Sequence, residues 1–240
     1  MLTTTHNQIQ NQPIRQPNEF NTKNKIRLAL NLNALTESST IAHYPAIYIG
    51  SGLDLEFPLV LNARHIVMID PCFAVEKNRQ TILKKVLEYG SEAKPIRMIT
   101  AWHHHIEFNF DSGRGPEKTT VDLFARSFAD YRSILPIGYI IEFNSILNHS
   151  LFKANLLERL LIGGLVINNH ESPLRQTMPK LSILDWVDFS GKSDSEEELE
   201  DKQARKLGLE TIRVDNVPFA VYQKVADSPR LIKYANSCQQ

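Results

Sequence analysis

The sequence has little cysteine, no net charge and no long apolar run. Its 240 residues include only two cysteines, Cys72 and Cys238, which lie far apart in the chain. Two cysteines are too few for a disulfide scaffold or a cysteine-rich zinc site. No apolar run approaches the roughly 20 residues that cross a bilayer, and the first residues show no secretory signal. We therefore expect a cytoplasmic protein without membrane contact, although export without an N-terminal signal would give the same pattern.

The charges balance, with 27 basic and 27 acidic residues. Such a chain lacks the overall positive field of proteins that bind nucleic acid mainly through phosphates. The sequence also lacks the patterns G-x-x-x-x-G-K-S/T, G-x-S-x-G and H-E-x-x-H, which disfavours nucleotide triphosphatases and the common hydrolases. We expect a small-molecule substrate rather than nucleic acid, and the sequence does not indicate an oligomeric state.

Short apolar runs alternate with segments of helical spacing. The runs typical of buried strands are residues 45–50, 65–70, 95–100, 138–143 and 165–168. The segments typical of helices are residues 54–61, 73–89 and 151–161, the last ending at the glycines 163–164, with a further start at 181–186. Residues 106–110 alternate like a hairpin arm, and residues 210–214 and 219–225 like a terminal hairpin. The pattern predicts an α/β fold with a doubly wound, mostly parallel sheet and an antiparallel terminal hairpin.

The N-terminal segment differs in composition from the rest. Residues 1–25 are rich in Asn, Gln and Thr, and Pro13 and Pro17 interrupt any helix. Such a segment buries too little apolar surface to offset the entropy of ordering it, so we expect a disordered arm. The apolar residues of 26–35 are compatible with a strand or with the start of a helix.

The loop after the first predicted strand has the composition of a ligand-binding turn. It reads Gly50-Ser51-Gly52-Leu53-Asp54, and Asp70 follows Gly50 by twenty residues at the end of the next strand. Glycines allow a tight turn and close approach of a ligand, and a carboxylate so placed can accept hydrogen bonds from a ribose. The alternative is a glycine turn with a helix-capping aspartate before Pro71. The order and spacing favour a nucleoside site.

These motifs resemble those of the class I S-adenosylmethionine-dependent methyltransferases. Residues 46–52 (AIYIGSG) resemble the family's first motif, and residues 65–70 (HIVMID) its second. Residues 138–143 (GYIIEF) fall where its fourth strand lies, and residues 157–167 (LERLLIGGLVI) resemble its helix, glycine pair and strand. The resemblance covers about residues 41–225 and implies a Rossmann-like, seven-stranded sheet of order 3-2-1-4-5-7-6. We expect one such domain over residues 26–230, followed by a tail of residues 231–240.

The resemblance also implies which residues hold S-adenosylmethionine. Gly50 and Gly52 contact the methionyl part in that family and Asp70 the ribose, and we expect Ser51 and Pro71 to lie beside them. Two positions depart from the family pattern. Tyr48 replaces an acidic residue, and Asp54 replaces a third glycine. A carboxylate at position 54 would repel a pyrophosphate but could bind the ammonium group of the methyl donor, which favours that cofactor over NAD.

Four further residues are candidates for the site. Trp102 is expected either to stack on the adenine or to be core, and Glu142 to lie at the cofactor. Asn144 and His170 follow two later strands, where acceptor groups would be handled. His170 could remove a proton from an acceptor, although it and its asparagine neighbours could equally satisfy loop backbone groups.

The histidine run at residues 103–105 gives a weaker signal. On a strand, His103, His105 and Glu107 would share one face as a possible metal trio. A solvated histidine loop is the commoner outcome, so we expect no metal ion.

The leading hypothesis is therefore a methyltransferase with S-adenosylmethionine as cofactor and a small-molecule acceptor. Because of Tyr48 and Asp54, a catalytically inactive, methyltransferase-like binding or scaffold protein is the alternative. An NAD-dependent oxidoreductase is the third.

Overall fold

Buried aliphatic residues form the parallel centre of the sheet. The computed structural model describes residues 19–36, 39–90, 97–111, 113, 115–127, 131–143, 150–169, 204–205, 207–212, 214 and 219–227. Strands β1 (Ala46–Ile49), β2 (His65–Ile69) and β6 (Ile137–Glu142) are almost wholly buried, as expected where helices cover both faces of a sheet. β1 pairs in parallel with β2 on one side and with β6 on the other.

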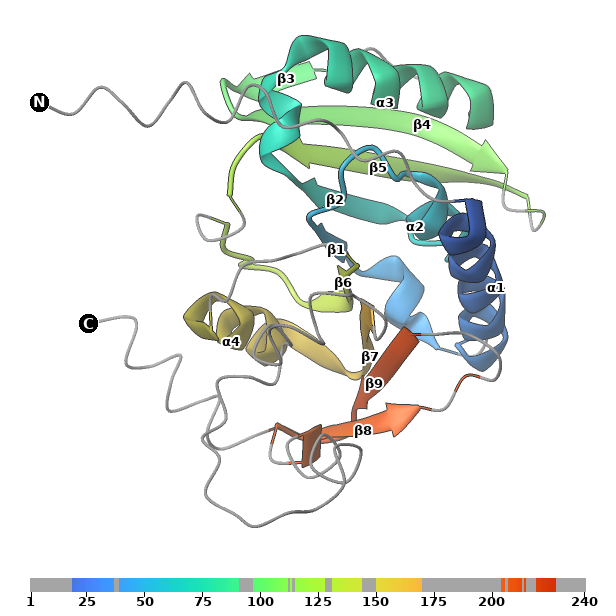
Figure 1. Cartoon of the computed structure of the whole chain (residues 1–240), viewed down its shortest axis with the longest axis vertical. Helices are drawn as coiled ribbons and strands as arrows, with labels where there is room; N and C mark the ends of the chain where they lie inside the picture. The colour runs from blue at the N-terminus through green and yellow to red at the C-terminus, as the bar shows by residue number, and fades with distance from the viewer. Residues whose placement is uncertain are drawn as a thin grey trace, which may run out of the picture.

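The sheet extends on both sides of this centre (Figure 1). On one side β5 (Pro116–Phe124) is parallel to β2, and β4 (His103–Asp111) and β3 (Arg97–Thr100) follow antiparallel. On the other side β7 (Leu160–Asn169) is parallel to β6. Antiparallel β9 (Phe219–Lys224) and β8 (Leu209–Ile212) form the predicted terminal hairpin. The full order is β3-β4-β5-β2-β1-β6-β7-β9-β8.

The expected sheet of seven strands is wrong, because the described part of the chain already forms a sheet of nine. Residues 95–100 were expected to form the third parallel strand, but β3 is a short, exposed strand at the edge of the sheet. The strand that pairs in parallel with β2 is β5 instead. The first half of β5 is polar and does not resemble a buried strand in the sequence. The observed order therefore differs from the expected 3-2-1-4-5-7-6. That order is found only among the seven strands that remain when β3 and β4 are left out, β5-β2-β1-β6-β7-β9-β8.

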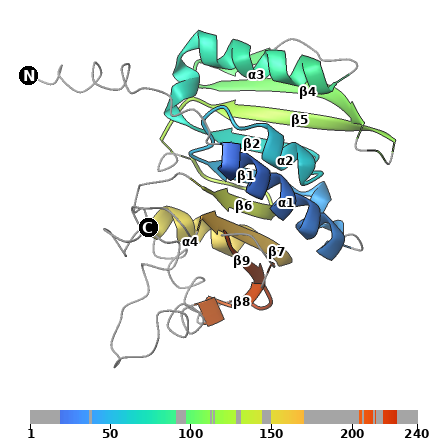
Figure 2. The same ribbon diagram turned by 45° about the vertical axis from the view of Figure 1, so that its right-hand side comes forward.

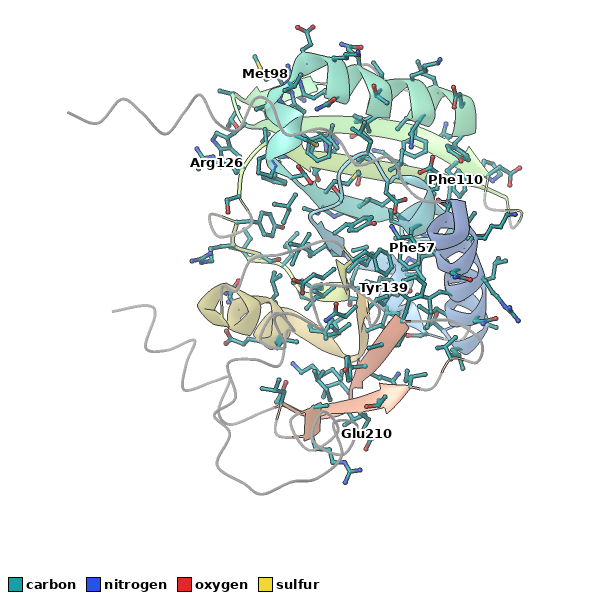
Figure 3. All side chains as sticks on the ribbon, viewed as in Figure 1. Phe57, Met98, Phe110, Arg126, Tyr139 and Glu210 are labelled. Atoms are coloured by element: carbon teal, nitrogen blue, oxygen red, sulfur yellow. The ribbon has the colours of Figure 1, made fainter. Side chains whose placement is uncertain are left out.

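Helices cover the two faces of the sheet unequally (Figure 2). α1 (Glu19–Leu35), α2 (Glu56–Val60) and α3 (Glu76–Tyr89) pack on one face, which we call the first face. α4 (Ser150–Arg159) and Leu207 pack on the opposite, second face beside β6, β7 and β9. Two short 3-10 helices, η2 (Thr40–His43) and η3 (Pro71–Ala74), lead into β1 and α3. Phe57 and Tyr139 lie inside the first face, between the sheet and α1 (Figure 3).

The boundary predicted for the N-terminal arm needs correction. α1 begins at Glu19, so the last residues of the predicted disordered arm are helical and residues 26–35 form no strand. Burial of Leu28, Ala29 and Leu32 on the first face supplies the apolar contact that stabilises this helix. The limits of the arm, the domain and the tail otherwise stay predictions, because residues 1–18 and 228–240 are outside the described part of the chain, as is the predicted helix start at 181–186.

The glycines at 163–164 also differ from their predicted role. They were expected to end a helix, but α4 ends at Arg159 and the glycines lie within β7. Gly163 has a φ of 87°, and the pairing of β7 with β6 shifts register between Ile137 and Tyr139. The positive φ lets the strand bulge there and continue. Among the described residues, no helix is long and apolar enough to cross a membrane.

Close packing of β6 on η2 gives a test of this fold. A Cβ atom added to Gly138 would clash with the backbone carbonyl oxygen of Ile41. Because this oxygen belongs to the backbone, no change of side-chain rotamer can relieve the clash. We expect Gly138→Ala to lower the free energy of unfolding by at least about 2 kcal/mol, measured by urea denaturation. Gly113→Ala is the control, because its added Cβ meets open space and only its φ of 80° is unfavourable, at about 1 kcal/mol. Equal losses in the two variants would contradict the packing described here.

Candidate functional site

The turn after β1 brings two glycines to the carboxyl edge of the parallel strands. Gly50 and Gly52 have φ values of 60° and 52°, a backbone region that favours glycine. The Gly50 N–H donates to the carbonyl oxygen of Ile69 in β2 at 2.9 Å, so the turn continues the pairing of the two strands. A Cβ built on Gly52 would meet nothing within 4 Å. The turn therefore has open space beside Gly52, whereas the neighbouring Ser51 is buried.

Asp70 joins this turn to the end of β2. Its Oδ2 accepts from the Gly52 N–H at 2.9 Å, and its Oδ1 accepts from the Cys72 N–H at 2.8 Å. The second contact caps η3, whose first residue is Pro71. The predicted neighbourhood of Gly50, Gly52 and Asp70 is therefore present, and the helix-capping role is present as well. Burial and the Asp70 carboxylate raise the pKa of Cys72, so its thiol stays protonated and is a poor nucleophile.

Asp54 lies in an ion pair that the sequence did not reveal. Its Oδ2 accepts from Lys25 Nζ at 2.6 Å and from the Tyr48 hydroxyl at 2.7 Å. Lys25 comes from α1, is only 6% exposed, and also lies 4.5 Å from the centre of the Phe143 ring. Burial, followed by the charge of Asp54, raises the pKa of Tyr48 well above its ordinary value. The two departures from the family pattern, Tyr48 and Asp54, thus contact each other and fasten α1 to the loop.

The remaining predicted site residues lie in different places. Glu142 ends β6, is 3% exposed, and pairs across the sheet with Ile49 just before the glycine turn. Trp102 lies between β3 and β4, and its ring carries the Arg126 guanidinium at 4.3 Å. Its carbonyl oxygen accepts from the Ala125 N–H at 2.8 Å, which places Trp102 beside the end of β5. Asn144 and His170 are outside the described residues, so their roles stay predictions.

A second polar cluster lies on the second face of the sheet, and sequence reasoning missed its centre, Asp122. His65 Nε2 lies 2.7 Å from Asp122 Oδ2, and His103 Nε2 and His105 Nδ1 lie 2.8 and 2.7 Å from Asp122 Oδ1. Burial alone would raise the pKa of Asp122, but the hydrogen bonds from the three imidazoles lower it well below its usual range. Alternation along β5 could have placed Asp122 on the histidine face, had residues 116–124 been identified as a strand.

The histidine run is therefore part of a strand and not a solvated loop. His103, His105 and Glu107 share a face of β4, as the strand alternative implied. His103 and His105 each direct one ring nitrogen at Asp122, and the other nitrogen of His105 lies 3.4 Å from Glu107 Oε1. No group of three potential ligands among the described residues is arranged to hold a metal ion. His104 points to the opposite face, where it is 4% exposed and burial lowers its pKa.

No protein-family model and no curated protein matches the sequence. Similar solved structures include an S-adenosylmethionine-bound amino pentose methyltransferase, CalS10, from Micromonospora echinaspora. It is 8% identical, with a TM-score of 0.44, and the match covers 89% of this chain and 100% of that one. A protein described as a methylase from Haemophilus influenzae is 12% identical, with a TM-score of 0.42 and coverages of 85% and 99%. One described as a methyltransferase from Escherichia coli is 13% identical, with a TM-score of 0.41 and coverages of 90% and 92%. At these values the roles of individual residues rest on the geometry of this chain.

The ion pair between α1 and the loop gives a first test of the site. Lys25→Met and Asp54→Asn should each lower the free energy of unfolding by about 2–3 kcal/mol, because each leaves a partly buried partner without its opposite charge. The double variant should lose clearly less than the sum of the two, measured by urea denaturation. Additive losses would contradict a direct interaction between the two side chains.

The Asp122 cluster predicts a pH dependence of stability. Because the pKa of Asp122 is lower in the folded state, its contribution is complete above the unfolded value near 3.9 and is lost as the pH falls toward the folded value. Asp122→Asn should cost about 2 kcal/mol at pH 7. The difference from the wild type should persist to about pH 5 and shrink below about pH 4.

The control for this test is Asp111→Asn, which changes an exposed aspartate whose oxygen accepts from the Gly113 N–H at 2.9 Å. An amide oxygen can accept the same bond, so little change is expected. Urea denaturation of the three proteins at a series of pH values measures the effect. If Asp122→Asn unfolds with the same free energy as the wild type at pH 7, the stabilising role of the Asp122 cluster is overturned.

Proposed function

We propose that this chain is a methyltransferase that binds S-adenosylmethionine at the turn of Gly50 and Gly52 and acts on a small-molecule acceptor. The observation that carries the proposal is the hydrogen bond from the Gly52 N–H to Asp70 at 2.9 Å. It joins a glycine turn and a carboxylate at the carboxyl ends of two adjacent parallel strands, where doubly wound sheets bind their ligands.

The residues present fit an adenosyl group with a flexible amino-acid tail. The open space beside Gly52 lets a ligand approach the backbone, and a side chain there would fill it. Each Asp70 oxygen accepts one backbone N–H and keeps a further lone pair, with which it can accept a ribose hydroxyl. Ser51, Pro71 and Glu142 border this turn in sequence or across the sheet, and we keep them in the proposed binding set.

Two of the predicted contacts take other roles in this proposal. Asp54 positions the loop rather than binding the cofactor's ammonium group, because Lys25 already neutralises its charge at 2.6 Å. Trp102 lines a cavity that none of Gly50, Gly52 and Asp70 lines, so we do not assign it to the adenine. For the acceptor, Asn144 and His170 remain the proposed polar groups on the loops after β6 and β7.

When bound, S-adenosylmethionine supplies an electrophilic methyl group. The task of the chain is then to orient the acceptor toward it and to exclude water, and positioning of this kind lowers barriers without a covalent nucleophile. His170 is the proposed acceptor of a proton from a hydroxyl or amine. The predicted cytoplasmic location belongs to this proposal as well.

One observation keeps a second function in view. Tyr48 and Asp54, the departures from the family pattern, form a connected structural unit with Lys25. A binding or scaffold protein that keeps the fold and has no turnover is compatible with that unit. It predicts binding of the cofactor or of its demethylated product without methyl transfer to any acceptor.

The proposal is tested by calorimetric titration with S-adenosylhomocysteine. We expect binding by the wild type and a loss of about tenfold or more in Gly52→Ala, because the new methyl group occupies the space beside the turn. The matched control is Gly113→Ala, a substitution at another open, positive-φ glycine in the β4–β5 connection. It should bind as the wild type does.

A companion substitution tests the role of Asp70. Asp70→Asn keeps one oxygen acceptor but removes the charge. We expect the affinity for S-adenosylhomocysteine to fall about tenfold and the free energy of unfolding to change by less than the free energy of binding does. NADH serves as the competing ligand. Stabilisation of the protein by NADH and not by S-adenosylhomocysteine, seen as a rise in Tm, would favour the oxidoreductase and overturn the proposal.

A further inference from the structure

The connection between β5 and β6 leaves part of the second face without a helix. β5 ends at Phe124 and β6 begins at Ile137, and the described residues between them form no helix. A crossover between parallel strands commonly carries a helix that covers the sheet. The described residues of this connection, 125–127 and 131–136, have no regular secondary structure, and Arg126 lies beyond the end of β5 in Figure 3.

A cavity of about 490 Å³ lies under this connection. Its floor is formed by side chains of β2, β4 and β5, and its wall by the connection itself and by Trp102. None of the residues Gly50, Gly52, Asp54 and Asp70 lines it, so it is separate from the proposed cofactor site. Its size lies in the range of about 300–1,000 Å³ that is usual for small-molecule sites.

Flat aromatic rings dominate the lining. His103 and Phe124 stack with ring centres 4.2 Å apart and 14° between the ring planes. The Trp102 and Tyr131 rings lie 5.4 and 5.0 Å from that of Phe124. Pro45, Val67, Ile134 and Leu135 are the aliphatic residues of the lining. Such a surface matches a planar ring system, which gains both burial and ring contacts.

The polar groups at the cavity are mainly donors and cations. Among the described residues of the lining, Asp122 is the only acidic one, and its carboxylate accepts from His65, His103 and His105. Arg126 and Arg132 border the cavity and are exposed. Arg126 holds its guanidinium over the Trp102 ring at 4.3 Å, and the fork of donors of a guanidinium fits a carboxylate.

We propose that this cavity binds a planar aromatic carboxylate, with its ring among Trp102, Phe124 and Tyr131 and its carboxylate at Arg126 and Arg132. The site does not depend on the proposed methyl transfer, because its residues and those of the glycine turn are different. The two proposals can thus fail separately.

Three probes of one shape test the ligand class with the full chain. They are 2-naphthoate, neutral 2-naphthamide and cationic 2-naphthylmethylammonium, each titrated calorimetrically at pH 7. We expect 2-naphthoate to bind about tenfold or more tightly than the amide, and the cation to bind most weakly, since only the anion forms charge-assisted hydrogen bonds with arginine. Tighter binding of the cation, equal binding of all three, or no binding of any would overturn the proposal.

Variants then separate the ring contacts from the charge contacts. Arg126→Gln and Arg132→Gln should each weaken 2-naphthoate severalfold and leave 2-naphthamide unchanged, whereas Trp102→Leu should weaken both. The matched control is Arg159→Gln at the end of α4, an exposed arginine that does not line the cavity. Only small changes in Tm are expected, since the substituted arginines are exposed and Arg126→Gln loses a surface contact with the Trp102 ring. Loss of 2-naphthoate affinity in Arg159→Gln as large as in the other two would indicate a nonspecific charge effect and refute the site.

Discussion

The Asp70 carboxylate connects the elements on which the proposed site depends. A glycine turn with two positive φ values has few internal contacts to hold it, since neither Gly50 nor Gly52 has a side chain to pack. Asp70 supplies that restraint by accepting from the Gly52 N–H, while its other oxygen caps η3. Lys85 of α3 adds a second restraint, donating to the Leu53 carbonyl at 2.8 Å. The open space beside the turn therefore has a defined shape before any ligand arrives, which lowers the entropic cost of binding.

The Lys25–Asp54 ion pair extends the same logic to α1. A partly buried carboxylate at the start of α2 needs a counter-charge, and the nearest one comes from a helix 29 residues earlier in the chain. The Tyr48 hydroxyl, directed from β1 onto the same oxygen, completes the pairing. The family pattern has an acid and a glycine at these two positions, and this chain has a phenol and an acid that hold a helix. The departures thus have a structural explanation that does not require loss of cofactor binding.

The central fold could be predicted because its strands are short, apolar and parallel. β1, β2 and β6 are buried on both faces, so their sequences are continuous aliphatic runs that end in turn residues. β5 escaped prediction because one end is exposed and carries Glu117 and Lys118, and only its second half is buried. Missing β5 led to the wrong third strand, because residues 95–100 were placed beside β2 instead. The start of α1 was also missed, because the polar composition before Ile26 gives no sign of Lys25 and its distant partner.

The candidate site also contains residues that the sequence could reveal and residues that it could not. Gly50, Gly52 and Asp70 could be found because the spacing of a turn and the next strand end is local and regular. Asp122 and its three histidines could not, because they come from β2, β4 and β5 and meet only through the register of the sheet. His65 pairs with Thr120 from one side of β5 and His105 with Asp122 from the other, and no sequence separation reveals that. Long-range pairing of this kind is visible only once the strand order is known.

The two faces of the sheet place different demands on the sequence. On the first face, helices exclude water, and Lys25, which is buried there, has a partner at 2.6 Å. On the second face, three imidazoles of β2 and β4 and the carboxylate of Asp122 in β5 satisfy one another. A polar floor with aromatic walls is costly to keep for packing alone, since aliphatic residues would serve equally well. The combination of satisfied polar groups and a cavity above them is what binding a polar aromatic ligand requires, and it is the physical basis for assigning this face a role of its own.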